Sequence, residues 1–541
     1  MNETRRNILL ASAAVGGVAL AGGAAWWYLR TTGEQHAPGA AAGDAGLFVN
    51  PLLVPGASGP LGVIDVKGPL AMSARAAQFP ILKGKPGRLL AYQVEQGGKS
   101  FVNPIFRVQS GAQFSARLEN ALDEPTIVHW HGLKVDARND AHPQFQVAAG
   151  AAYEYRFPVA NRAGTYWYHP HPHRLTAKQA YLGLASFFIV EDHEERALQK
   201  ALDLGFGASD IPLVIQDKNL DSYGALSYAP DDEQKVNGYV GGDLLVNLTP
   251  RPRFEAATRI YRFRILNGSN ARIYRLAFAK GGEPLECHVI ATDGGLLESA
   301  VKVREAFLSP GERVEVLLDL RSARVGDTVW LKSLAFDPMH LEMEMPMEHG
   351  APAGHAGMAG MGAPGLADGA AIDLLRIDVA RKLAYDRPVP AVLSRLAPAQ
   401  PGTGEVRKFA LERTEDRWRI NGRTFETDEA PVTVHRGAAE VWELRNAARS
   451  MPHPMHLHGF NFRVLERRGS PAQQEPLALN AQGLAATDLG WKDTVLLWPG
   501  ETVRIALDFS HSWSGDQTFL FHCHNLEHED EGMMINFKVQ G

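Results

Sequence analysis

Short segments in which apolar and polar residues alternate recur along the chain, and several of them follow a glycine turn. Three of these segments resemble one another, at residues 147–157, 308–319 and 497–508. Because successive side chains of a strand point to opposite faces, the alternation predicts half-buried strands that leave tight turns. The repetition predicts an all-β protein built from copies of one domain.

A second repeated element supports the same organisation. Residues 106–120 resemble residues 432–446, and residues 261–267 are similar to part of both. Short alternating strands separated by regular turn signals are typical of Greek-key β-sandwiches. We therefore predict three β-sandwich domains, at residues 46–193, 194–385 and 400–541.

The chain begins with a segment typical of an export signal. Arg5 and Arg6 precede a weakly hydrophobic run over residues 8–25, and such a start directs bacterial proteins to the twin-arginine pathway. We expect residues 1–30 to be this signal, residues 31–45 to be a flexible tether, and the protein to be periplasmic. An uncleaved membrane anchor is the alternative, although a run so rich in glycine and alanine makes a poor spanning helix.

Composition narrows the classes of function. The 541 residues carry a formal net charge of -6 with acidic and basic residues interspersed, which excludes the basic stripe of a nucleic-acid-binding protein. The two cysteines, Cys287 and Cys523, could form one disulfide, but Cys523 lies between two histidines, which favours metal ligation. Cys287 is predicted to be an ordinary buried strand residue. We expect the protein to be a monomer.

Ten of the twenty histidines fall in four short clusters, two in the first predicted domain and two in the third. The clusters are His129 with His131, His169 with His171, His453 with His456 and His458, and His522 with His524 and His528. The second domain has the same strand repeats without these histidines. The clusters are therefore added to a common scaffold and are not required by it, which favours a functional role over core packing.

Strand geometry indicates how these residues share metal ions. The two histidines of a His-x-His sequence lie on one face of a strand. Cys523, between His522 and His524, faces the other way. One strand would then contact two separate metal centres.

The residue types indicate copper. A thiolate, two imidazoles and a weak axial thioether are the ligands of a blue electron-transfer copper, and Cys523, His528 and Met533 supply three of them. His453, which stands apart from the following pair, is the natural fourth ligand. Eight further imidazoles suit several copper ions close together, and one blue copper with a three-copper cluster stores the four electrons that reduce dioxygen to water. Zinc sites are closed and often contain several cysteines, so this set of residues does not indicate zinc.

Four motifs carry a family resemblance: His-Trp-His-Gly at residues 129–132, and the histidine-rich segments 167–173, 453–459 and 522–534. They closely resemble the motifs of bacterial three-domain multicopper oxidases, which include laccases and periplasmic cuprous oxidases. The resemblance covers essentially the whole chain after the tether. It implies three cupredoxin-like domains, with a trinuclear copper cluster between the first and the third.

The resemblance also implies a role for each site residue. Four copper ions would be held by the type 1 ligands His453, Cys523, His528 and Met533, the type 2 ligands His129 and His456, and the type 3 ligands His131, His169, His171, His458, His522 and His524. Asp140 and Glu529 match acidic positions that supply protons in the family. Reduction of dioxygen to water consumes protons, so carboxylates near the cluster are useful donors.

The sequence leaves two classes of substrate open. Residues 339–361 hold six of the twelve methionines, and thioethers select Cu(I). The insertion, at about 339–369 in the second domain, is similar to the lid over the blue copper of cuprous oxidases, with Met339, Met343, Met345, Met347 and Met451 as candidate Cu(I) ligands. Arg449 departs from that pattern, because the cuprous oxidases carry an acid there. Cu(I) and small phenolic or aromatic reductants both remain candidates, and the insertion could also be a passive linker.

We therefore predict a multicopper oxidase that couples four one-electron oxidations to the reduction of dioxygen, in copper tolerance. The alternative class is a copper-sequestering or electron-carrier protein without oxidase turnover. A carrier needs only the blue copper site and has no use for eight further histidines. The number of bound copper ions separates the two classes.

Overall fold

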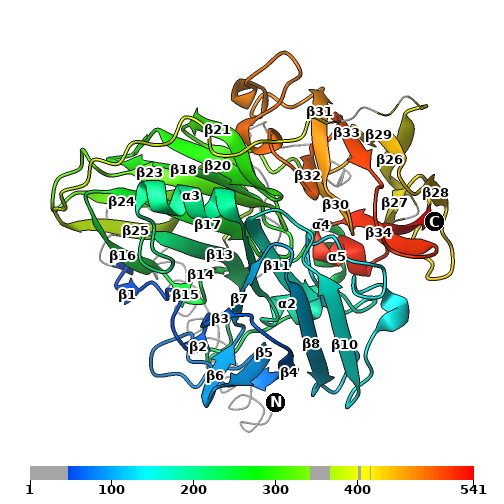
Figure 1. The fold of residues 1–541 in the computed structure, drawn as a ribbon, viewed down its shortest axis with the longest axis horizontal. Helices are drawn as coiled ribbons and strands as arrows, with labels where there is room; N and C mark the ends of the chain where they lie inside the picture. Colours follow the sequence, from blue (N-terminus) through cyan, green and yellow to red (C-terminus); the bar gives the residue numbers. More distant parts are fainter. Residues whose placement is uncertain (1–46, 341–365, 400–401, 403, 415) are drawn as a thin grey trace, which may run out of the picture. The chain divides into compact units, whose positions relative to one another are not determined.

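The computed structural model describes residues 47–340, 366–399, 402, 404–414 and 416–541. The predicted export signal, the tether and most of the methionine-rich insertion lie outside the described residues. Within the described part of the chain, six sheets form three facing pairs, each pair enclosing its own hydrophobic core. The predicted all-β fold class is confirmed, and Figure 1 shows the strands of the three pairs coloured by their position along the chain.

The first pair of sheets is formed by residues 59–191. One sheet has the order β10-β8-β4-β5-β6-β2 and the other β3-β7-β12-β11-β9. The strands are β2 (Gly59–Pro60), β3 (Val63–Asp65), β4 (Leu70–Ala77), β5 (Leu89–Gln96), β6 (Lys99–Val102), β7 (Ile105–Gln109), β8 (Gln113–Asn120), β9 (Val128–His129), β10 (Ala152–Pro158), β11 (Gly164–Pro170) and β12 (Ser186–Glu191).

The second pair has the orders β1-β16-β25-β24-β18-β19, with β22 also paired to β18, and β15-β14-β13-β17-β23-β20-β21. The strands are β1 (Asn50–Pro51), β13 (Asp210–Lys218), β14 (Asp243–Val246), β15 (Thr249–Pro250), β16 (Pro252–Ala257), β17 (Ile260–Asn267), β18 (Tyr274–Lys280), β19 (Glu283–Pro284), β20 (Cys287–Thr292), β21 (Gly295–Val303), β22 (Ala306–Leu308), β23 (Arg313–Asp319), β24 (Thr328–Ser333) and β25 (Ile372–Arg381).

Strand β1 belongs to this second pair although its residues fall in the range predicted for the first domain. It pairs in parallel with β16, and Leu52 N donates a hydrogen bond to Arg253 O just beyond it. Unpaired backbone groups at the edge of a sheet can take up an additional strand from elsewhere in the chain. The alternation of residues in a segment this short does not identify its partner sheet.

The third pair has the orders β27-β26-β29-β33-β31 and β28-β35-β34-β30-β32. The strands are β26 (Arg407–Thr414), β27 (Arg417–Ile420), β28 (Val432–His435), β29 (Ala439–Asn446), β30 (His453–Leu457), β31 (Phe462–Arg468), β32 (Thr494–Leu497), β33 (Thr502–Asp508), β34 (Gln517–Cys523) and β35 (Met534–Gln540).

Helices are short and lie between strands. The α-helices are α2 (Thr176–Tyr181), α3 (His193–Leu202), α4 (Asp232–Asn237) and α5 (Leu526–Asp530), and the 3₁₀ helices are η2 (Pro143–Phe145), η3 (Glu475–Leu477) and η4 (Ala486–Asp488). None of the helices found in the described ranges has the length and apolar character needed to span a bilayer.

The glycine turns that repeat in the sequence have one structural role. Gly150, Gly311 and Gly500 have φ angles of 75°, 85° and 78°, a region that glycine adopts without steric cost. Each turn leads into a strand that pairs antiparallel with the preceding repeated strand, giving the pairs β8 with β10, β17 with β23 and β29 with β33. The sequence repeats are therefore copies of one strand pair.

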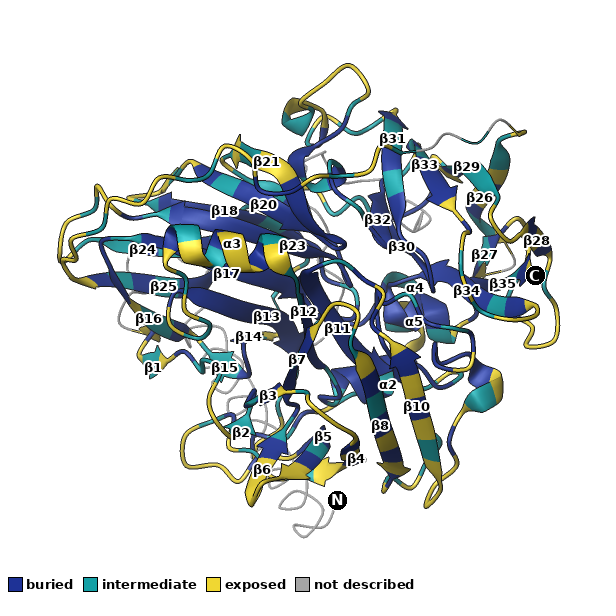
Figure 2. Ribbon diagram, viewed as in Figure 1, coloured by how far each residue is buried: buried dark blue, intermediate teal, exposed yellow. Residues whose placement is uncertain are grey.

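The burial of individual strands shows where the domains meet. Figure 2 shows β8 and β10 alternating between buried and exposed residues, whereas β11 and β17 are buried along their whole length. The reason is that a cluster of Trp167 and Ile189 from the first pair of sheets packs against Val214 and Leu266 from the second. Sheet faces that would otherwise be exposed to solvent are covered by the neighbouring domain.

A network of buried charges stabilises the same region. Arg264 on β17 donates to Asp210 on β13 (Nε–Oδ1 2.8 Å) and to Glu195 on α3 (Nη2–Oε1 2.6 Å), and its neighbour Arg262 donates to Glu195 and to Glu315 on β23. All five side chains are buried. The arginines hold the pKa of the Glu195 carboxyl down to about 2, although burial alone would raise it. Each charge in the network depends on its partners for compensation.

Replacing Arg264 with methionine is therefore expected to lower the free energy of unfolding by about 3–5 kcal/mol, because the buried Asp210 loses both of its hydrogen bonds from Arg264 and keeps only Arg262 at 3.6 Å. Chemical denaturation of the purified protein measures the change. Arg117→Met is the matched control, because Arg117 pairs with Glu154 on the exposed face of β8 and β10 and should contribute at most about 1 kcal/mol. Equal losses of stability in the two variants would contradict a stabilising role of the buried charge network around Arg264.

Candidate metal centre

Strand pairing brings the histidine clusters together. In the first pair of sheets, β9 and β11 place His129 opposite His169, and in the third pair, β30 and β34 place His456 opposite His522. Side chains opposite each other in antiparallel strands lie about 4.5–5.5 Å apart at Cβ. The register of each sheet therefore sets two imidazoles side by side before the two domains meet.

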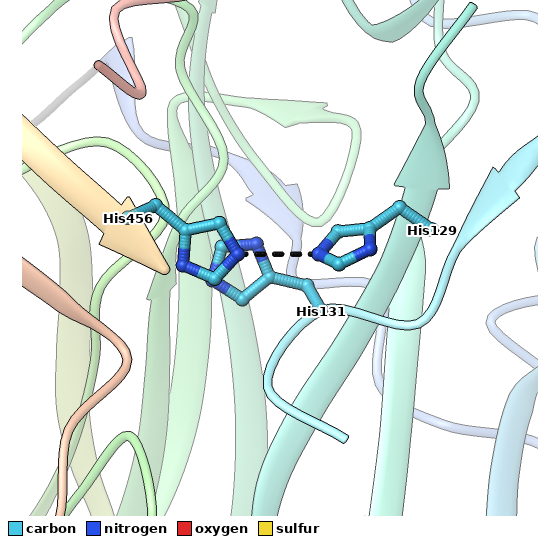
Figure 3. A group of neighbouring side chains, drawn as sticks. All are labelled: His129, His131 and His456. Carbon is cyan, nitrogen blue, oxygen red and sulfur yellow. Dashed lines mark hydrogen bonds between the residues drawn. The ribbon is translucent and has the colours of Figure 1, made fainter. Parts of the chain in front are cut away.

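The contact between the first and third domains completes three groups of histidines. Figure 3 shows the first group, in which Nε2 of His129 lies 3.2 Å from Nε2 of His456 and the His131 ring stacks on His456. The second group is His131, His169 and His524, and the third is His171, His458 and His522. In each group the ring nitrogens lie within 4.8 Å of one another, and all the side chains are buried.

The hydrogen bonds of the outer ring nitrogens test whether these groups suit a metal ion. Nδ1 of His456 donates to Asp493 O (2.8 Å), Nδ1 of His522 donates to Cys523 O (3.0 Å) and Nδ1 of His169 donates to Pro170 O (2.9 Å). A neutral imidazole that donates from one nitrogen has a lone pair on the other. The nitrogen lone pairs therefore face those of neighbouring imidazoles, as between Nε2 of His458 and Nε2 of His522, which are 3.0 Å apart. A cation bound between the two nitrogens would relieve the repulsion of their lone pairs.

Two further features fit a metal ion. Both ring nitrogens of His524, and Nδ1 of His171, are buried and have no hydrogen-bond partner among the described residues. Burial also lowers the pKa of His522 to about 4 and that of His131 well below its ordinary value. These rings are therefore neutral at pH 7, which is the form of histidine that binds metals.

A second centre surrounds the one buried thiol of the third domain. Sγ of Cys523 lies 3.5 Å from Nδ1 of His453 and 3.5 Å from Nδ1 of His528. The Nε2 atoms point away, that of His453 lying 3.2 Å from Ser450 Oγ and that of His528 donating to Val236 O at 2.8 Å. Both Nδ1 atoms are thus directed at the sulfur, as in a trigonal His₂Cys site.

The thiol itself also depends on a metal. Burial raises the pKa of Cys523 well above its ordinary value, and a bound cation is what would offset the cost of a buried thiolate. Met533, the predicted axial ligand, is buried. Its backbone O accepts a hydrogen bond from Cys523 N, and its backbone N donates one to His528 O. Cys287 is a free, buried residue of β20, as predicted.

The two predicted proton donors each lie between two rings. The Asp140 carboxylate is 3.4 Å from Nδ1 of His129 and 3.2 Å from Nδ1 of His458, and burial raises its pKa to about 6 against the opposing effect of His129. Glu529, on α5, is 3.2 Å from both His171 Nε2 and His522 Nδ1, and burial raises its pKa well above the ordinary value. Both carboxyls are almost completely buried.

The predicted Cu(I) ligands are only partly described. Met339 is partly buried and packs against a cluster that includes Phe307 and Trp498, and Met451 is buried in the core of the third domain together with Cys523. Met343, Met345 and Met347 lie outside the described residues. Of the two described candidate methionines, Met451 is therefore buried in the protein interior and Met339 is only partly buried.

Two residues that contact the histidines were missed in the sequence. Asp493 Oδ1 accepts from His131 Nε2 at 2.9 Å, and Thr494 Oγ1 lies 3.1 Å from His456 Nδ1. Both are buried, Thr494 as the first residue of β32 and Asp493 directly before it. The signal that could have identified them is the polar run Lys492-Asp493-Thr494 directly before an apolar strand, since buried polar residues require partners.

Sequence comparisons agree with this arrangement. Profiles described as multicopper oxidase match residues 91–195 and 396–541, the segments that carry the histidine clusters. A multicopper oxidase of Staphylococcus haemolyticus is 30% identical over 443 residues, which cover 81% of this chain and 82% of that protein. A laccase of Bacillus subtilis is 31% identical, covering 76% of this chain and 78% of the laccase.

A solved structure matches the fold. The McoA multicopper oxidase of the hyperthermophile Aquifex aeolicus superposes with a TM-score of 0.79 and 36% sequence identity, covering 91% of this chain and 99% of McoA. This similarity confirms the predicted cupredoxin-like fold class. The histidine groups thus lie on a scaffold that this chain shares with a multicopper oxidase.

Proposed function

The chain belongs to the multicopper oxidase family, and from this premise we propose that it oxidises a small reductant by single electrons and reduces dioxygen to water. The observation that carries the proposal is the convergence of eight buried histidines from two domains next to a His₂Cys site. Copper, when bound, supplies one-electron chemistry by changing between Cu(I) and Cu(II). A coupled set of such ions matches the four electrons that dioxygen requires.

The residues divide into two centres. His453, Cys523, His528 and Met533 would hold the type 1 copper, His129 and His456 the type 2 copper, and His131, His169, His171, His458, His522 and His524 the type 3 pair. Cys523 links the centres, because its peptide neighbours His522 and His524 belong to two different histidine groups. A path through these few covalent bonds would connect the two centres.

Two carboxyls would supply the protons. Glu529 lies beside the group formed by His171, His458 and His522, and Asp140 lies beside His129 and His458. Both carboxyls are sheltered from bulk water, and a positioned carboxylic acid can deliver a proton to the oxygen being reduced.

Copper content and oxygen uptake test the proposal together. The oxidase should bind about four copper ions per chain and consume dioxygen when a reductant is added, because each centre accepts single electrons. One copper ion or fewer, without oxygen uptake, would instead identify an electron carrier or a copper-sequestering protein. The copper-free protein serves as the control for uncatalysed oxidation.

We propose Cu(I) or a small phenolic or aromatic compound as the reductant, and the methionine-rich segment is the feature that separates them. If its thioethers bind Cu(I), replacing Met343, Met345 and Met347 together with leucine should raise KM for Cu(I) by about tenfold or more, because leucine keeps the size and removes the soft ligand. Oxygen uptake at graded Cu(I) and diphenol concentrations measures this change.

The matched control replaces Met358 and Met361 with leucine, since these lie in the same segment. Undiminished Cu(I) oxidation in the triple variant would identify the insertion as passive, and turnover of the diphenol without oxidation of Cu(I) by the wild type would identify a laccase-type enzyme. A role in copper tolerance follows only if Cu(I) is the substrate. We further propose that the twin-arginine signal places the enzyme in the periplasm, where cell fractionation would locate it.

A further inference from the structure

The second domain contributes no histidine to the three groups among the described residues, yet one of its turns contacts them. The turn is the repeated glycine turn that joins β22 to β23. A Cβ atom on Gly311 would lie 3.0 Å from the His524 ring, closer than such atoms normally approach, and the φ of 85° also favours glycine. The second domain thus lies directly against a ring of the candidate cluster.

Arg313, two residues after this glycine, joins all three domains. Its Nη1 and Nη2 donate to Oδ1 and Oδ2 of Asp493 in the third domain at 2.7 and 2.6 Å. Its Nε donates to Thr165 O in the first domain (2.9 Å), and within its own domain it donates to Gly311 O and Asp293 O. The guanidinium is completely buried and all its nitrogens have partners.

The bidentate pair determines where the Asp493 carboxylate points. The same Oδ1 that accepts from Arg313 accepts from His131 Nε2 at 2.9 Å, so the proton of His131 resides on Nε2 and the lone pair on Nδ1. That Nδ1 faces His169 Nε2 at 3.3 Å. His131 is therefore held in the opposite tautomer to His169, His456 and His522, whose Nδ1 atoms donate to backbone carbonyls.

We propose that Arg313 of the second domain is a positioning residue for the copper cluster between the first and third domains. It acts through Asp493, fixing the tautomer and the ring orientation of His131, and the turn at Gly311 supports His524. The inference rests on the proposed function, since it assigns a role at the same cluster. It explains why a domain without ligands is placed against the site.

Neighbouring buried ion pairs support the pair of Arg313 and Asp493. Lys492, next to Asp493, donates to Asp293 Oδ2 (3.0 Å) and Glu312 Oε1 (2.9 Å), both in the second domain, and is itself buried. Two adjacent residues of the third domain are thus each paired with charges on the second domain. Because hydrogen-bonding partners of ligands set ring orientation, their loss typically costs about 10–100-fold in metal affinity.

The test compares Arg313→Lys and Arg313→Gln with the wild-type protein. Both variants should release cluster copper to a chelator at about 10–100-fold lower chelator concentration, and the number of Cu(II) ions per chain that EPR detects should rise, because the coupled pair that His131 would help to hold is EPR-silent only while both ions stay coupled. The visible absorption of the His453–Cys523–His528 site should persist in both. Lysine keeps the charge but cannot form the bidentate pair, so a role limited to neutralising Asp493 would leave Arg313→Lys like wild type.

Arg467→Gln is the matched control, because Arg467 forms a buried bidentate pair with Asp488 away from the histidine groups. Wild-type copper retention and EPR spectra in both Arg313 variants, or equal loss at both centres as in an unfolded control, would overturn the inference while the oxidase proposal stands. A wild-type protein that binds at most about one copper ion would overturn both proposals.

Discussion

Replacing Cys523 with alanine is expected to abolish oxidation of every reductant and to remove one copper ion per chain. Cys523 supplies the sulfur at 3.5 Å from both Nδ1 atoms of its centre and is also the covalent link to His522 and His524. Without the thiolate, the two imidazoles lose the soft ligand that characterises a blue copper site. Oxygen uptake should fall to the rate of the copper-free protein, and the visible absorption should disappear.

The other cysteine provides the control for this substitution. Cys287→Ala removes a thiol of similar burial from the core of the second domain, so it should cost some stability but no copper. Copper analysis and oxygen uptake with both Cu(I) and a diphenol distinguish the two variants. A blue, active Cys523→Ala protein would refute the assignment of the electron-accepting centre.

Replacing Glu529 with glutamine is expected to lower the rate of oxygen uptake by about 10²–10⁴-fold, the contribution of a positioned general acid or base. The carboxyl lies 3.2 Å from His171 Nε2 and from His522 Nδ1, and an amide of the same shape cannot pass on a proton. Copper content and the visible absorption of the Cys523 centre should remain those of the wild type. Stopped-flow reoxidation of the reduced enzyme by dioxygen isolates the affected step.

Glu527→Gln is the matched control for this prediction. Glu527 is a buried glutamate in the same helix, but it accepts from Asn270 Nδ2 and Tyr228 OH and not from the histidine groups. Its substitution should leave reoxidation nearly unchanged. A similar loss of rate in both variants would indicate a general effect on α5, and an unaffected Glu529→Gln variant would leave Asp140 as the candidate donor.

Local sequence patterns were sufficient to predict much of the fold. The glycine turns at Gly150, Gly311 and Gly500 and the alternating residues after them predicted the strands that leave these turns, because side-chain direction along a strand depends only on the local backbone. The family motifs implied the same three-domain scaffold. The sheet that takes up strand β1 could not be predicted from the chain, because the partner of an edge strand is chosen by backbone groups distant in sequence.

The same local rule predicted part of the candidate site. His522 and His524 share a side of their strand, and Cys523 between them reaches the separate centre with His453 and His528. Spacing alone could not divide the eight histidines into three groups. That division depends on the registers of β9 with β11 and of β30 with β34, and on the packing of the first domain against the third.

The sequence by itself thus determined the repeated β domains, the residue types of both metal centres and the direction of each side chain within its strand. Only the tertiary structure decided which histidines face one another and that Arg313 and Asp493, 180 residues apart, form one buried pair beside His131. The physical reason is that periodicity encodes orientation within one element, whereas contacts between distant elements arise from packing and from the pairing that buried charges require.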